Sequence, residues 1–170
     1  MCKVVAETFR WFGPLGISVI LFVAIGVLWV LIGALTVPLH NRGIAPQIIF
    51  VSQATDSAYF GGSPAGLLAS DPAISKLRSL LLTVIAGFLL LAGFLFVSVA
   101  WLGLGAGATW ALVSLGLAGI VAIGFWAFLL WPYVRSGIPL TLSDLPPFMW
   151  IPTALILPAF VLGWIGLLSG

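Results

Sequence analysis

The most obvious deficit of this sequence is charge. Only 6% of its 170 residues are Asp, Glu, Lys or Arg, whereas 62% are hydrophobic. Soluble domains carry about 25% charged and about 45–50% apolar residues, so this chain has too few charged side chains to cover a water-exposed surface. The composition excludes a soluble enzyme, a disordered protein and a nucleic-acid-binding module. It leaves an integral membrane protein whose surface is solvated mostly by lipid.

Reactive side chains are equally scarce. The chain has one cysteine, Cys2, and one histidine, His40, which exclude an internal disulfide, a Cys-x-x-Cys redox site and a zinc-type ligand cluster. No ionisable residue is expected in the interior of a membrane span, which argues against a proton pump, an ion-coupled transporter and a voltage sensor. The sequence therefore favours a protein that is not an enzyme. It predicts no cofactor, apart from a haem or pigment that His40, at the membrane surface, could ligate.

Long charge-free stretches define the expected membrane spans. They cover residues 11–41, 79–134 and 145–170. Because a helical crossing needs about 20 apolar residues, the first and last stretches each hold one span and the middle stretch holds two. A glycine-rich turn at 103–109 joins these two. The sequence thus predicts a single all-α transmembrane domain, with spans at roughly 16–39, 77–102, 109–131 and 147–168.

Four such helices with short connections most simply form an antiparallel bundle, with the N- and C-termini on the same side of the membrane. The interfacial loop 40–76 is too short to have its own core, so we expect a loop-rich cap between the first two helices. Within this loop, Ser63 before Pro64 predicts the N-cap of a short helix. Asp71 before Pro72 predicts the N-cap of the second long helix in the same way.

Seven charged residues are expected to gather at the headgroup level, on the side of the two larger loops. They are Arg42, Asp56, Asp71, Lys76, Arg78, Arg135 and Asp144. Basic residues at this level attract anionic lipid headgroups. A count of Lys and Arg favours a cytoplasmic location for loops 40–76 and 132–146, although the first helix considered alone indicates the opposite orientation.

Two features of the later spans concern helix packing. Ser114, Ala118 and Ala122 recur at four-residue spacing, so they predict a small-residue face for close packing within the chain or against another protein. Pro158, near the middle of the last span, predicts a helix kink. A kink of this kind either opens a ligand cavity or is filled by a neighbouring helix.

Three functions are compatible with these features. The first is a non-catalytic accessory or structural subunit of a larger membrane complex, for example an energy-transducing or transport assembly. The second is a binder of a lipophilic molecule such as a quinone, a carotenoid, a pigment or a lipid. The third is a lipid-acting membrane enzyme or carrier that uses the headgroup-level charges. The expected partners are membrane lipids and either other membrane subunits or further copies of the chain, and no nucleic acid.

Overall fold

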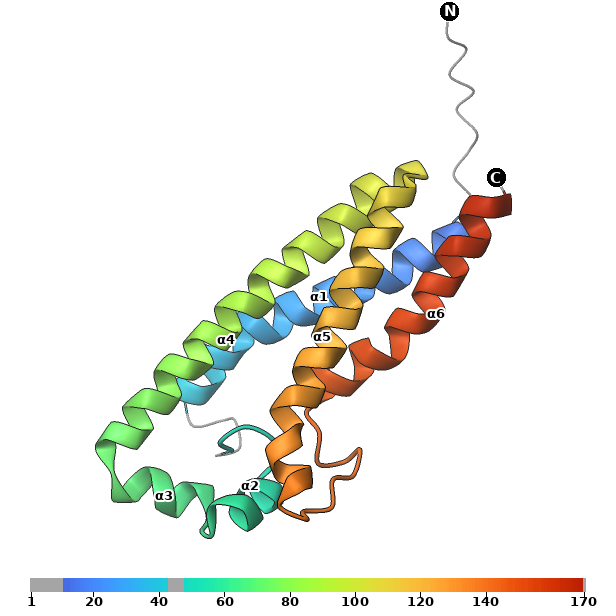
Figure 1. Ribbon diagram of the computed structural model, residues 1–170. Helices are drawn as coiled ribbons and strands as arrows, with labels where there is room; N and C mark the ends of the chain where they lie inside the picture. The colour runs from blue at the N-terminus through green and yellow to red at the C-terminus, as the bar shows by residue number, and fades with distance from the viewer. Residues whose placement is uncertain (1–10, 43–47, 170) are drawn as a thin grey trace, which may run out of the picture.

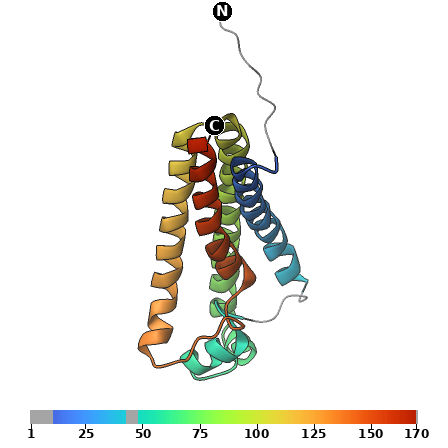
Figure 2. The same ribbon diagram turned by 90° about the vertical axis from the view of Figure 1, so that its right-hand side faces the viewer.

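The computed structural model describes residues 11–42 and 48–169, without the side chains at positions 40 and 41. Throughout these ranges the regular elements are helices, and no strand occurs in them. Four helices are long and apolar enough to cross a membrane, which identifies a multi-pass membrane protein by length and composition. They are α1 (Pro14–Asn41), α4 (Pro72–Ser98), α5 (Thr109–Arg135) and α6 (Pro147–Ser169). Figure 1 shows all four, and Figure 2 shows them from the side.

The segment between α1 and α4 is more helical than the predicted loop-rich cap. It contains α2 (Gln53–Phe60) and α3 (Pro64–Ser70), and α4 begins at Pro72 instead of near residue 77. Both predicted N-caps are confirmed: Ser63 accepts a hydrogen bond from the amide of Gly66, and Asp71 accepts one from the amide of Ala73. The two short helices lie at one end of the long helices (Figures 1 and 2).

The opposite end carries the predicted glycine-rich turn. Helix α4 continues into a π-helical turn, η1 (Val99–Gly103), and a 3-10 turn, η2 (Leu104–Ala106). Gly107 then adopts a φ of 75°, a left-handed conformation that glycine tolerates best, and α5 begins at Thr109. From this turn α4 and α5 diverge toward the end that carries α2 and α3 (Figure 1).

Helix α1 packs closely against α4 through small residues. A Cβ atom added to Gly93 would lie 2.5 Å from the carbonyl oxygen of Gly26, and one added to Gly33 would lie 2.7 Å from that of Ala86. Gly26 and Gly33 are seven residues apart on α1, and Ala86 and Gly93 are seven residues apart on α4. Residues with this spacing lie on one face of a helix. These positions let the two backbones approach closely, as small residues do in membrane helices.

Helix α1 also packs against α6. The Ser18 hydroxyl donates a buried hydrogen bond of 2.6 Å to the carbonyl of Ala159. At the far end of α6, a Cβ at Gly166 would meet the backbone of Leu15, so the start of α1 lies beside the end of α6. Between these two interfaces the aromatic core of the protein lies around Phe22 and Trp29 of α1, which are buried.

The structure places only part of the predicted small-residue face of α5 against the rest of the chain. Ser114 and Ala118 are exposed, and Ala122 is partly buried against the core. Helix α5 instead meets α6 through Gly116 and Gly119, where an added Cβ would lie 2.6 Å from Phe160 and 2.7 Å from Ile156, respectively. Contact of the Ser114 face with another protein stays a prediction.

Candidate functional site

One of the short helices, α2, carries a buried carboxylate. Asp56, in the first turn of α2, is 0% exposed. Its Oδ2 atom accepts hydrogen bonds from the amides of Ile49 (2.6 Å) and Phe50 (3.0 Å). Its Oδ1 atom accepts bonds from the amide of Val51 (3.3 Å) and the hydroxyl of Tyr133 (3.1 Å). Asp56 thus fixes the irregular segment 49–51 and joins it to the end of α5.

Arg78 of α4 is hydrogen-bonded to the start of segment 48–51. Its side chain is 7% exposed, and its Nε atom donates a hydrogen bond of 2.6 Å to the carbonyl of Ile48. The negative charge of Asp56 attracts the Arg78 guanidinium. Arg78 therefore holds the segment at the carbonyl of Ile48, and Asp56 holds it at the amides of residues 49–51.

Tyr133 completes this arrangement, and it was not among the predicted site residues. Its side chain is 4% exposed, and its ring lies 4.5 Å from that of Tyr59 of α2, centroid to centroid. A buried tyrosine hydroxyl needs a hydrogen-bond partner, and Asp56 supplies it. A tyrosine at the cap end of a span, facing a loop with only two carboxylates, Asp56 and Asp71, is the signal that could have indicated this contact.

The seven predicted headgroup-level charges differ in burial, and their gathering into one cluster stays a prediction. The structure brings Asp56 and Arg78 together and buries both. Of the other members, Arg42, Asp71, Lys76 and Arg135 are exposed, and Asp144 is partly buried. The hydroxyl and the amide of Thr141 donate hydrogen bonds of 2.6 Å and 2.9 Å to Asp144, which hold the pKa of that carboxyl below its usual range.

Two other predictions concern His40 and Pro158. The side chain of His40 lies outside the described residues, so its role as a haem or pigment ligand stays a prediction. Pro158 lies inside α6 with an exposed side chain, and the kink predicted there stays a prediction. Within residues 11–42 and 48–169, no group of three metal-ligating side chains occurs.

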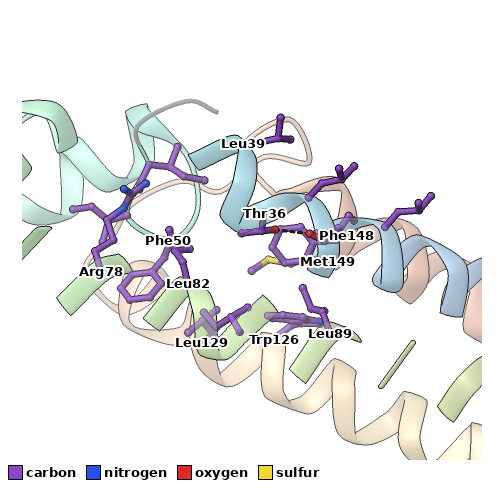
Figure 3. Close-up of a pocket in the computed structure, with 16 residues that line it drawn as sticks. Thr36, Leu39, Phe50, Arg78, Leu82, Leu89, Trp126, Leu129, Phe148 and Met149 are labelled. Carbon is purple, nitrogen blue, oxygen red and sulfur yellow. Dashed lines mark hydrogen bonds between the residues drawn. The ribbon is translucent and has the colours of Figure 1, made fainter. Parts of the chain in front are cut away.

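An apolar cavity of about 320 Å³ lies beside Arg78, where α4 and α5 diverge (Figure 3). Side chains from α1, α4, α5, α6 and segment 48–50 line it, and nearly all are aliphatic or aromatic. The hydroxyl of Thr36, one of its few polar groups, donates to the carbonyl of Ile32 within α1. Among the described lining residues Arg78 alone is charged, so the cavity offers hydrocarbon walls with one cation at its edge.

A second apolar cavity of about 260 Å³ lies between α4 and the short helices. Phe60 of α2, Leu67 of α3 and Leu77 of α4 are among its walls. Five residues line both cavities: Ile49, Phe50, Arg78, Leu82 and Ile85. In Figure 3, Phe50, Leu82 and Arg78 gather on one side of the first cavity, at this common wall.

Comparison of the chain with protein-family models, with curated proteins and with solved structures gave no significant match.

Proposed function

We propose that this chain binds a lipophilic molecule from the membrane in the 320 Å³ cavity at the divergent end of α4 and α5. That cavity is the observation that carries the proposal. In the same proposal the four long helices cross the membrane as an antiparallel bundle, with both termini on one side. The loops 40–76 and 132–146 then face the cytoplasm, which a count of Lys and Arg favours.

The size and the chemistry of the cavity support a hydrocarbon ligand. Protein interiors contain few voids larger than a water molecule, because side chains around a void lose dispersion contacts. An enclosed apolar cavity of about 150 Å³ already stays dry and accepts a benzene molecule, and the cavity here is larger and partly open to its surroundings. A larger apolar cavity, bordered by helices that lipid surrounds, therefore regains contacts when a hydrocarbon chain or ring fills it.

The test is retention of a bound molecule after purification in mild detergent, measured by native mass spectrometry and extraction. Leu129→Trp places a larger ring at the wall of the cavity, because Leu129 lines it. Leu117→Trp is the matched control, since Leu117 lies on the same helix and is 59% exposed. We expect the wild type and the control to retain the molecule and Leu129→Trp to lose it. An empty wild-type protein, or equal retention by all three, would contradict the proposal.

We propose membership of a larger membrane complex, as a non-catalytic subunit, as a second candidate function. Ser114 and Ala118 support it, because the packing of α5 against α6 leaves these small residues outward. In this case other chains co-purify in a fixed ratio, and Ala118→Leu lowers that ratio while Leu117→Ala on the same outward face does not. A particle with the mass of one chain in mild detergent would exclude this function.

A further inference from the structure

The two cavities meet at one wall, and the positive charge of the site lies in that wall. Segment 49–50 and one face of α4 separate the cavities, and Arg78 lines both. A single molecule could therefore place one apolar part in each cavity, with its polar part at Arg78. This arrangement differs from an isolated hydrophobic pocket, which favours a ligand with one apolar part.

The charge that a ligand would meet at this wall is positive. Asp56 lines neither cavity; it is completely buried, and its two oxygen atoms accept four hydrogen bonds. The carboxylate attracts Arg78 electrostatically, although it is not part of either cavity wall. Arg78 is thus held by protein contacts and still borders both cavities.

The depth of Arg78 in the membrane also agrees with a headgroup contact. Arg78 follows the first residue of α4, Pro72, by six positions, which is about 9 Å along a helix that rises about 1.5 Å per residue. The polar side of this region is the start of α4, where the exposed charges Asp71 and Lys76 lie. The apolar walls Leu82, Ile85 and Leu89 follow Arg78 on α4, toward the interior of the span.

From this geometry we propose that the ligand is an anionic amphiphile with two hydrocarbon chains, such as an acidic phospholipid. Its chains occupy the two cavities, and its headgroup lies at Arg78. The inference rests on the proposed function, because it names the ligand class of the same cavity. Basic residues at a membrane surface attract acidic lipids, and an arginine suits a phosphate group through its planar fork of donors.

The experiment compares lipids that differ in one property at a time. The full-length protein is incubated in mixed micelles with equal amounts of phosphatidylglycerol, phosphatidylcholine and the single-chain lysophosphatidylglycerol, and the retained lipid is identified by native mass spectrometry. We expect phosphatidylglycerol to exceed phosphatidylcholine by about fivefold. We also expect it to exceed the single-chain lipid.

Four variants assign these preferences to residues. Arg78→Gln removes the headgroup preference while Arg78→Lys retains most of it. Leu129→Trp blocks only the first cavity and Leu77→Trp only the second, so each lowers retention of the two-chain lipid. Leu117→Trp serves again as the control. If Arg78→Gln fails to fold, the lipid comparison on the wild type decides the headgroup charge by itself.

The outcomes separate this inference from the proposed function. If the wild-type protein retains phosphatidylcholine or the single-chain lipid as strongly as phosphatidylglycerol, this result overturns the proposal of a two-chain anionic ligand but agrees with the proposed binding of a lipophilic molecule. A wild-type protein that retains none of the three, and no other molecule from its native membrane, overturns both. Unchanged retention in Leu77→Trp overturns the role of the second cavity.

Discussion

Replacement of Asp56 by Asn should destabilise the protein far more than a one-atom change suggests. The carboxylate accepts four hydrogen bonds, two on each oxygen. An Asn side chain keeps one oxygen, which we expect to face the amides of Ile49 and Phe50, since those bonds are the shortest. Its NH₂ group then faces Val51 and Tyr133. The tyrosine hydroxyl can rotate and accept, but the Val51 amide loses its partner.

The cost follows from these contacts. A buried donor left without a partner costs about 1–3 kcal/mol. The two retained amide bonds weaken by about 1 kcal/mol each, because bonds to a charged group are worth about 1.5–3 kcal/mol and neutral ones about 0.5–1.5 kcal/mol. The expected loss in the free energy of unfolding is therefore about 3–5 kcal/mol. Tyr133→Phe removes one of the four donors and should cost about 0.5–3 kcal/mol.

Equilibrium unfolding in mixed detergent and SDS micelles, followed by circular dichroism, measures these differences. Asp71→Asn is the matched control, because Asp71 is exposed and caps α4, and Asn caps helices about as well as Asp. Hydrogen exchange at the Ile49 and Phe50 amides reports on the segment itself and should accelerate in Asp56→Asn. If Asp56→Asn is as stable as Asp71→Asn and exchange is unchanged, the structural role assigned to Asp56 is refuted.

Two further predictions concern other parts of the molecule. Gly93→Ala should destabilise the protein by about 1–3 kcal/mol, because its Cβ meets the backbone of α1. Gly87→Ala on the same helix meets no atom within 4 Å and should stabilise it by up to about 1 kcal/mol; equal effects in thermal unfolding would argue against the α1–α4 contact. Because hydrogen bonds from Thr141 lower the pKa of Asp144 in the folded state, its contribution to stability is full above the unfolded carboxyl pKa of about 3.9. It is lost as the pH falls through the lower folded value. Thr141→Val should raise this pKa in a carbon-13 NMR titration, and an unchanged pKa would contradict the assignment.

The sequence predicts the local features of this fold well. The charge-free stretches indicate the four long helices, since uninterrupted apolar runs of about 20 residues or more are sufficient evidence for spans. The turn near Gly107 and the N-caps at Ser63 and Asp71 are also correct. Each depends on residues within one or two helical turns of one another, so the sequence carries the whole signal.

The burial of Asp56 and Arg78 depends on contacts that no local pattern reveals. Asp56 and Tyr133 are 77 positions apart in the chain, and Arg78 lies 30 positions from the carbonyl that it binds. One local signal was present: Ser52 and Gly61 bracket α2 as its N-cap and its left-handed C-cap. With that helix recognised, Asp56 falls in its first turn, directly after an apolar segment whose amides need acceptors.

The packing faces show why a four-residue spacing of small residues was insufficient. In α1 and α4 the close contacts use residues seven apart, at Gly26 and Gly33 and at Ala86 and Gly93. On α5 the contacts with α6 lie at Gly116 and Gly119. Many faces of a Gly- and Ala-rich span carry small residues, and the position of the neighbouring helix decides which face is used.

The buried charges and the apolar cavities have a common physical cause. Irregular backbone close to lipid must have its amides and carbonyls hydrogen-bonded within the protein, because hydrocarbon offers no partners. Asp56 supplies acceptors for the amides of residues 49–51, and Arg78 supplies a donor for the carbonyl of Ile48. With its backbone held in this way, the segment places Ile49 and Phe50 in the wall between the cavities. The two residues that hold the segment therefore also position the wall between the cavities, and one of them, Arg78, places a cation at their border.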